Sequence, residues 1–307
     1  MDEDLEYVNC PVCNSSDYRK VYDSKDYLYS KKSFSIVGCN SCGLMYTNPR
    51  IKEKQIGHYY FSEYAPYNIK QSKCIVRKIK NKVNLMLGDN TLSILEELKH
   101  METKTVLEIG PGSGIFLSML KERGFSVAGV DIDKDCVQQL RSDGITCYQG
   151  SLTEVIDKII PNKFDAIILC QVFEHIYNPV ETLELLYKLL NQNGIIYMTV
   201  PNSNSWEATL FKEYWRGFDL PRHVIHYDDI TIKEILTKNG FVVKRLSSIV
   251  FPSSFLESIG FRFFKNSHIP KLLYLILYYP WKLLQTILVK AIGSGVIEII
   301  AYKNKVD

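Results

Sequence analysis

Short apolar runs alternate with amphipathic stretches over most of the chain from residue 105 onward. Six apolar runs have the length and composition of strands: 106–109, 125–131, 145–148, 164–169, 195–200 and 241–246. Four stretches between or after them have helical character: 115–123, 133–141, 180–190 and 230–239. This alternation predicts an α/β domain, and the nearly continuous apolar run at 164–169 is typical of a strand covered on both faces.

A second apolar region, residues 251–292, has a different pattern. Its apolar run at 272–281 is about half the length that a bilayer span requires, and Pro280 and Lys282 interrupt it. We therefore predict no transmembrane helix here. A helical pair capping the substrate site is the favoured interpretation. A dimer surface and a peripheral contact with a membrane stay open, the latter because aromatic and basic residues gather at 261–265.

Residues 51–100 precede the α/β part as an aromatic and helical linker or lid. Aromatic residues are dense at 58–67, where they either line a pocket wall or pack between two parts of the protein. Apolar residues recur at helical spacing over 70–100, and the first half of this stretch is basic. A solvated helix face explains that basic run better than an anionic partner does.

The first predicted strand of the α/β part ends in a glycine turn. Glu108 lies within the strand, and Gly110, Gly112 and Gly114 follow before an apolar helix. A strand, a glycine turn and a helix allow backbone N–H groups to approach a nucleotide-like ligand. The spacing is not the dinucleotide-binding Gly-x-Gly-x-x-Gly, and no Gly-Lys-Ser/Thr of a phosphate loop follows.

The next strand, 125–131, ends in Asp131, where βαβ nucleotide folds place the carboxylate that holds a ribose. Together, the acid, the glycines and this carboxylate resemble class I S-adenosylmethionine (SAM)-dependent methyltransferases. The resemblance implies a seven-stranded Rossmann-like sheet whose last strand, 295–302, is antiparallel. It also implies that Glu108 orients the methionine end, that the glycines face the ligand, and that Asp131 binds the ribose hydroxyls.

Further cofactor contacts follow from the same resemblance. Ile132 comes directly after the ribose carboxylate, and Ser151 and Leu152 take the place of an Asp-hydrophobic pair beside the adenine. Ser151 replaces the aspartate, but its hydroxyl could still accept a hydrogen bond. Gln171, after the strand at 164–169, completes the expected set.

Two Cys-x-x-Cys pairs near the N-terminus predict a metal site. Cys10, Cys13, Cys39 and Cys42 can present four thiolates to a zinc ion, and short strands between the pairs indicate a zinc ribbon. Four cysteine ligands leave no open coordination position, so the zinc should be structural. The other four cysteines have no partner spacing and are predicted to be buried thiols: Cys74, Cys136, Cys147 and Cys170.

Three histidines are candidate general bases. His175 lies past the strand at 164–169, beside Glu174, where the pair could act on the substrate or fix the loop by hydrogen bonds; the structural role is slightly favoured. His223 and His226 lie in a segment that loosely resembles the base-containing stretch of zinc-ribbon methyltransferases acting on nucleotide-linked deoxysugars. By that comparison His223 is the first candidate, and Arg222 could meet a phosphate or carboxylate. The aromatic stretch 203–217 before it is predicted to cover the substrate.

Composition narrows the class of protein. The chain has 307 residues, 46% hydrophobic and 23% charged, and a net charge of +3. These values fit a globular enzyme and do not demand nucleic acid as a partner. An N-terminus without an apolar core, together with eight cysteines, favours reduced thiols and a cytoplasmic location.

We therefore expect a zinc ribbon at 1–50, the linker at 51–100, and a methyltransferase domain at 101–307 with the apolar insert. The expected reaction moves a methyl group from SAM to a small or glycan-like acceptor, such as a nucleotide- or lipid-linked sugar, with a histidine base. The alternatives are a zinc-ribbon RNA base methyltransferase and a non-catalytic SAM-binding scaffold. The oligomeric state is left open.

Overall fold

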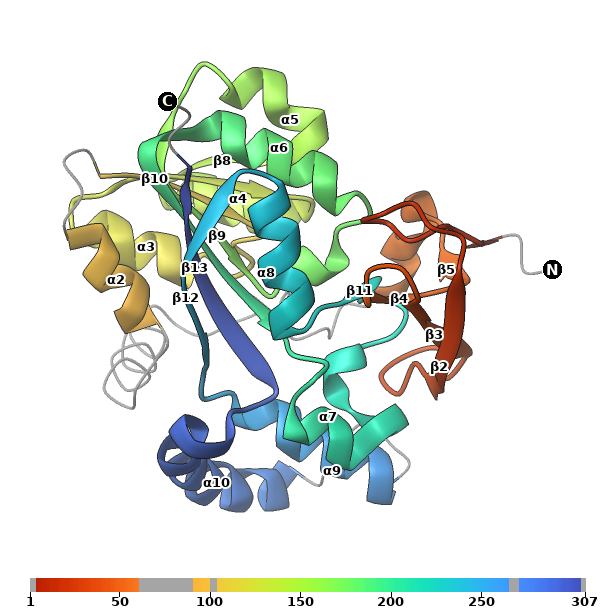
Figure 1. Cartoon of the computed structure of the whole chain (residues 1–307). Helices are drawn as coiled ribbons and strands as arrows, with labels where there is room; N and C mark the ends of the chain where they lie inside the picture. The colour runs from red at the N-terminus through yellow and green to blue at the C-terminus, as the bar shows by residue number, and fades with distance from the viewer. Residues whose placement is uncertain (1–3, 61–90, 100–103, 265–270, 305–307) are drawn as a thin grey trace.

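The computed structural model of the chain describes residues 4–60, 91–99, 104–264 and 271–304 (Figure 1). The expected helix at 70–100 therefore falls outside the described residues as far as residue 90, as do Cys74 and most of the aromatic stretch at 58–67.

A seven-stranded sheet forms the centre of the molecule, in the order β12-β13-β10-β9-β6-β7-β8. Its strands are β6 (Thr105–Ile109), β7 (Ser126–Asp131), β8 (Thr146–Gln149), β9 (Phe164–Cys170), β10 (Leu190–Pro201), β12 (Phe241–Ser248) and β13 (Val296–Lys303). β6 pairs in parallel with β7 and β9, whereas β13 runs antiparallel to both β10 and β12. The expected Rossmann-like sheet with a reversed last strand is confirmed.

Helices cover both faces of this sheet because successive residues of its strands point to opposite sides. α5 (Leu152–Ile159), α6 (Pro179–Leu189) and α8 (Asp229–Lys238) pack on the face that carries Leu107, Ile167 and Met198. α2 (Thr91–Lys99) and α3 (Ile115–Glu122) pack on the face that carries Val106 and Ile168. α4 (Lys134–Ser142) packs against α3 near the β8 edge. The two buried layers leave the strand ends as the place for ligands.

A smaller four-stranded sheet lies beside the large one, in the order β11-β4-β3-β2 (Figure 1). β2 (Tyr18–Lys25), β3 (Ser33–Cys39) and β4 (Met45–Thr47) come from the N-terminal region, but β11 (Ile225–His226) comes from far along the chain. A two-stranded ribbon of β1 (Leu5–Glu6) and β5 (Arg50–Ile51) and a 3₁₀ helix, η1 (Glu53–Tyr59), continue this part. The N-terminal region is thus joined to the α/β part by strand pairing.

The apolar region at 251–292 forms a helical pair, α9 (Pro252–Phe264) and α10 (Lys271–Ile292), at the lower end of the molecule in Figure 1. The pair lies where β10 ends, because Pro201 at that end is opposite Val296, the first residue after the insert to join the sheet. α7 (Trp206–Phe211) and the short helices η4 (Lys212–Tyr214) and η5 (Arg216–Phe218) lie next to it. None of the described helices is long and apolar enough to cross a membrane.

Candidate cofactor and catalytic site

The glycine turn after β6 requires glycine for steric reasons. Gly110 has φ of +68°, and a Cβ there would lie 2.6 Å from Val172 Cγ2. Gly114 has φ of +65°, and a Cβ there would lie 2.2 Å from Leu140 Cδ2. L-residues with a side chain rarely adopt these backbone angles, and a Cβ would also overlap a neighbouring side chain. Both positions therefore favour glycine for two separate reasons. The turn is therefore packed tightly against α4 and the loop after β9.

Gly112 connects the turn to Asp131 at the end of β7. The backbone N–H of Gly112 donates to Asp131 Oδ2 over 3.1 Å, and the N–H of Asp133 donates to Oδ1 over 2.8 Å. Burial raises the pKa of Asp131, while these two N–H donors lower it. The two bonds fix the carboxylate at the carboxyl end of β7, where a ribose diol would meet it.

Glu108 is the strongest sign that a cationic ligand fits this site. Its side chain is 4% exposed, and Oε2 has no hydrogen-bond partner within the described residues. Burial and the nearby Asp131 raise the pKa of Glu108 to about 8. Because an unpartnered buried carboxylate is costly, the site fits a ligand that brings a positive charge and N–H donors, as the amino group of SAM does.

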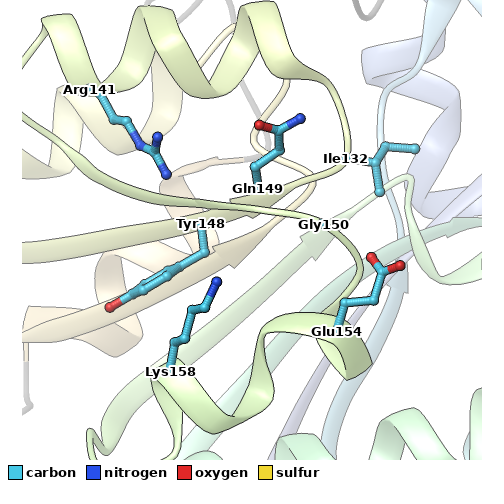
Figure 2. Close-up of a pocket in the computed structure, with 7 residues that line it drawn as sticks. All are labelled: Ile132, Arg141, Tyr148, Gln149, Gly150, Glu154 and Lys158. Carbon is cyan, nitrogen blue, oxygen red and sulfur yellow. The ribbon is translucent and has the colours of Figure 1, made fainter.

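The remaining predicted cofactor residues surround the ends of β7 to β9. Ile132 and Gly150 line a hollow of about 620 Å³ at this edge, with Gln149, Tyr148, Arg141, Glu154 and Lys158 on its other walls (Figure 2). Ser151 caps α5: its Oγ accepts from the Glu154 N–H over 3.4 Å, and its own N–H donates to Glu154 Oε2 over 2.8 Å. The predicted adenine contact of Ser151 would thus compete with a capping bond.

Leu152 and Gln171 lie in different surroundings. Leu152, the first residue of α5, is buried in the core, and Gln171 directly follows β9 with φ of +55°. The Gln171 side chain donates from Nε2 to Thr199 Oγ1 over 3.3 Å. Gln171 follows β9, which pairs with β6, whereas Leu152 follows β8 at the edge of the sheet. The contact of either residue with a cofactor stays a prediction.

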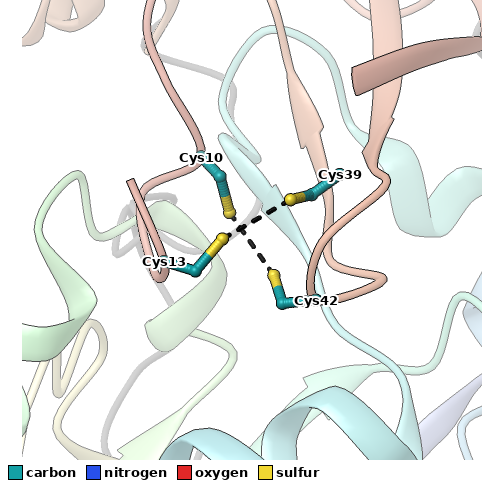
Figure 3. Close-up of side chains that lie close together, drawn as sticks. All are labelled: Cys10, Cys13, Cys39 and Cys42. Carbon is teal, nitrogen blue, oxygen red and sulfur yellow. Dashed lines mark hydrogen bonds between the residues drawn. The ribbon is translucent and has the colours of Figure 1, made fainter. Parts of the chain in front are cut away.

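The four N-terminal cysteines come together as expected (Figure 3). The sulfurs of Cys10 and Cys42 are 3.5 Å apart, as are those of Cys13 and Cys39, and all four lie within 4.8 Å of one another. Four sulfurs held tetrahedrally about 2.3 Å from a zinc ion would be about 3.8 Å apart. The donor set and its spacing fit a zinc ion with no position left for a substrate.

Glu174, His175 and His223 form a second cluster, whose ligand atoms also lie within 4.8 Å of one another. Glu174 and His175 lie on the 3₁₀ helix η3 (Phe173–His175), directly after the loop that contacts Gly110. The rings of His175 and His223 meet edge to face, with centroids 4.6 Å apart. The structure thus brings two of the three candidate bases together beside the glycine turn.

Backbone carbonyls orient both rings. Nδ1 of His175 lies 2.9 Å from the carbonyl oxygen of Arg222, and Nδ1 of His223 lies 2.7 Å from that of Gly217. Because a carbonyl only accepts, each Nδ1 carries the proton and each Nε2 offers a lone pair. Burial lowers the pKa of both, to about 4 for His175. His175 is only partly buried, whereas His223 is enclosed.

Glu174 lies behind these rings and is 1% exposed. Neither of its carboxyl oxygens has a hydrogen-bond partner in the part of the chain that the structure describes, and Nε2 of His223 is 3.9 Å from Oε1. Burial, with a smaller effect of Asp219, raises the pKa of Glu174 to about 8. The carboxyl group of Glu174 therefore lies within 4.8 Å of a ring nitrogen of each histidine, and a proton on it removes the cost of burying its charge.

His226 lies apart from this cluster, in strand β11 of the four-stranded sheet. Its Nε2 is 3.1 Å from Thr47 Oγ1, its ring meets Phe218 edge to face, and burial lowers its pKa to about 3. These contacts indicate a packing role. Its place as third candidate base stays a prediction.

Arg222 meets carboxylates of the protein itself. Its guanidinium Nη2 lies 3.1 Å from Asp26 Oδ1 and 2.6 Å from Asp219 Oδ1, and all three side chains are buried. This geometry favours a structural role for Arg222 over binding of a substrate phosphate. Neither partner of Arg222 was predicted from the sequence. The spacing of three residues between Asp219 and Arg222 is a signal for the first pair, but nothing in the sequence connects Arg222 with Asp26.

The stretch 203–217, expected to cover the substrate, instead fills the space next to the N-terminal sheet. Phe211 and Trp215 are buried in one cluster with Phe34 and Ile36 of β3. Because both aromatic side chains are buried in this cluster, the structure does not support the expectation that they cover the substrate. Tyr60, from the aromatic stretch before residue 61, does reach the cluster: its hydroxyl lies 3.1 Å from His175 Nδ1.

The fold and the site together define a class I SAM-dependent methyltransferase domain. A family model described as "Methyltransferase domain" matches residues 79–246, which is more than half of the chain. The chain therefore belongs to this methyltransferase family.

Curated relatives match over a shorter stretch. The ubiquinone biosynthesis O-methyltransferase of Pseudomonas paraeruginosa is 27% identical over 122 residues, which are 38% of this chain and 52% of that protein. The corresponding protein of Pseudomonas fluorescens is 25% identical over the same length. The chain spans about half the length of the curated relatives it matches.

Solved structures show the same fold over more of the chain. A SAM-dependent methyltransferase from Archaeoglobus fulgidus is similar with a TM-score of 0.50 and 20% identity, over 80% of this chain and 99% of that one. The magnesium protoporphyrin IX methyltransferase from Synechocystis PCC 6803, with bound S-adenosylhomocysteine, also has a TM-score of 0.50, at 15% identity over 82% of this chain and all of that one. At such identities the likeness establishes the fold alone.

Proposed function

We propose that the protein transfers the methyl group of SAM to a small or glycan-like acceptor, such as a nucleotide- or lipid-linked sugar, with a histidine as general base. The observation that carries this proposal is the cluster of Glu174, His175 and His223 beside the glycine turn. The acceptor class rests on the resemblance of the 220–227 segment to deoxysugar methyltransferases. The curated relatives are named for O-methyl transfer, which supports oxygen as the acceptor atom.

The cofactor side of the site is formed by two carboxylates and the turn between them. Glu108 would accept from the amino group of SAM, and Asp131, fixed by two backbone N–H groups, would accept from the ribose hydroxyls. Bound SAM supplies a methyl group on a positively charged sulfur. The task of the protein is then to hold the acceptor in line with that methyl group, and no catalytic metal is required.

The geometry makes His175 the better placed of the two clustered bases. Its Nδ1 proton is directed to the Arg222 carbonyl, so Nε2 is free to take a proton from an acceptor hydroxyl. Its lowered pKa keeps the ring neutral at pH 7, and its partial exposure gives an acceptor access. His223, the first candidate from the sequence, lies one layer deeper and would exchange a proton with Glu174.

The N-terminal sheet has a supporting role in this proposal. We propose the division into a zinc ribbon at 1–50, a linker at 51–100 and a methyltransferase domain at 101–307. The pairing of Met45 and Tyr46 with His226 and Ile225 supports a ribbon that braces the segment carrying His223. Structural zinc would act through that brace.

The test is methyl transfer by the zinc-loaded protein to a panel of nucleotide sugars and lipid-linked sugars, with RNA as the comparison. We expect turnover with at least one of the sugars. His175→Ala should lower the rate of methyl transfer at least about a hundredfold, as the loss of a general base does. His58→Ala, which changes an exposed histidine on η1, should leave the rate unchanged. Transfer to RNA alone would contradict the acceptor class. Full activity of His175→Ala would contradict the role of His175 as general base. A rate that depends on added divalent ions, and not on pH, would instead indicate that the cluster binds a metal ion.

A further inference from the structure

α10 exposes an apolar face on the outside of the molecule. Six of its exposed residues lie three, four or seven positions from one another: Leu273, Ile276, Leu277, Leu283, Leu284 and Ile287. Residues with this spacing share one side of a helix over several turns. The side chains of Leu283 and Ile287 are 67% and 68% exposed. Scattered exposed leucines are ordinary, but a continuous stripe of this length marks a contact surface.

The opposite side of α10 is firmly attached, so the helix cannot turn this stripe inward. Trp281 stacks on Phe255 of α9 with ring centroids 4.0 Å apart. Gln285 is buried; it donates from Nε2 to Glu207 Oε1 over 3.2 Å and accepts from the Phe251 N–H over 3.0 Å. The described part of the protein thus covers the side of α10 that carries Trp281 and Gln285, and it leaves the stripe uncovered.

Charge decides which partner fits the uncovered side. α10 contains no aspartate or glutamate, and the exposed Lys290, seven residues after Leu283, lies at the edge of its apolar stripe. A second copy of the chain packed through the same stripe would offer no acidic residue from its own α10 to pair with Lys290. An anionic lipid surface supplies the missing negative charge and an apolar layer together.

Exposed aromatic residues on both helices of the pair extend the same pattern. Phe263 and Tyr279 are both strongly exposed, and Arg262 lies beside the first of them. Aromatic and basic side chains are suited to the boundary between lipid head groups and acyl chains. A helix too weakly apolar to cross a bilayer can still lie in this boundary with one side buried.

We propose that α10 is a membrane-surface helix, which holds the protein on an anionic lipid bilayer through its outer apolar stripe and Lys290 at the edge of that stripe. This inference does not rest on the proposed acceptor. It would place a lipid-linked acceptor near the end of β10, where the α9–α10 pair joins the sheet.

The test is co-sedimentation of the full-length protein with vesicles of phosphatidylcholine and phosphatidylglycerol in equal parts, and with phosphatidylcholine alone. We expect binding to the mixed vesicles that weakens with salt, and at least about tenfold weaker binding for the double variant L283S/I287S. The variant Ile230→Ser removes an equally exposed isoleucine on α8 and should bind as the wild type does. Lys290→Glu should weaken binding to the anionic vesicles only.

Three results would overturn the proposal. The first is a wild type that does not sediment with mixed vesicles. The second is unchanged binding by L283S/I287S with a circular dichroism spectrum like that of the wild type. The third is a wild-type dimer that L283S/I287S converts to a monomer without any vesicle binding, which would assign the stripe to a second copy. All of these readouts are independent of methyl transfer, so they do not depend on whether the acceptor panel succeeds.

Discussion

The hydroxyl of Thr47 donates a hydrogen bond to the carbonyl oxygen of His223 over 2.9 Å. Thr47 ends β4, which pairs with β11, and Cys42 lies five residues before it. The four-cysteine module therefore holds the segment that carries a candidate base, although the two are far apart in sequence. Loss of the metal should therefore affect the position of His223 in the candidate cluster.

Zinc removal should uncouple transfer from cofactor binding. In the variant Cys39→Ser, or after chelation, we expect loss of bound zinc, a lower melting temperature and at least tenfold slower methyl transfer, since the brace on His223 loosens. SAM affinity should change little, because Glu108 and Asp131 belong to other strands. Metal analysis, calorimetry and activity on the same sample check this. A zinc-free protein with wild-type activity would contradict the role of the brace.

Gly114→Ala should destabilise the protein more than Gly124→Ala. Both glycines have positive φ, of +65° and +84°, so both variants carry the left-handed strain of about 1–2 kcal/mol. Only at Gly114 would the new Cβ overlap a neighbour, Leu140, whereas at Gly124 nothing lies within 4 Å. We expect a further loss of about 1–3 kcal/mol in the free energy of unfolding for Gly114→Ala. Urea unfolding of both variants measures the difference; equal losses would contradict the tight packing of the turn.

Glu174→Gln should change how stability depends on pH. The pKa of Glu174 is raised from 4.5 to about 8 in the folded protein, so between these values the folded chain holds a proton that the unfolded chain has lost. The contribution of this proton to the free energy of unfolding is complete below pH 4.5 and is lost as pH rises to about 8, at about 1.4 kcal/mol per pH unit. A glutamine does not titrate, so the variant does not lose stability in this way. In urea unfolding, the stability of the variant relative to the wild type should therefore increase from pH 5 to pH 8. Parallel dependence of the two stabilities on pH would contradict a buried, neutral Glu174.

Arg222→Met should act on stability rather than on substrate affinity. The guanidinium joins Asp26 and Asp219 in a buried group, and its removal leaves two carboxylates without that partner. We expect a loss of about 3–5 kcal/mol in the free energy of unfolding. Arg262→Met, an exposed arginine on α9, is the control and should be nearly neutral. A stable Arg222→Met with a raised KM would instead assign Arg222 to the substrate.

The sequence carried enough information for the fold because the α/β part is built from local signals. The apolar runs predicted the strands, and the glycines at 110, 112 and 114 marked the turn that only glycine fits. Paired cysteine spacing likewise predicted that four sulfurs would meet. In each of these cases the residues that define the feature are close in sequence or repeat a fixed spacing.

The site was less predictable where it depends on contacts between distant segments. Nothing in the sequence indicated that β11 would join the N-terminal sheet, or that His223 would lie behind His175. The aromatic residues at 203–217 resembled a substrate cover, but Phe211 and Trp215 pack against β3. Aromatic side chains serve packing and recognition equally well, and only the tertiary contacts separate the two.

Calorimetric titration with SAM and S-adenosylhomocysteine tests the central claim most directly. Asp131→Asn keeps the shape of the side chain but removes its charge, and Asp135→Asn, on the exposed side of α4, is the matched control. We expect the wild type and Asp135→Asn to bind both compounds, and Asp131→Asn to bind at least about tenfold more weakly, as for a lost charged hydrogen bond. Failure of the zinc-loaded wild type to bind either compound, or equal binding by Asp131→Asn, would contradict the cofactor site described above.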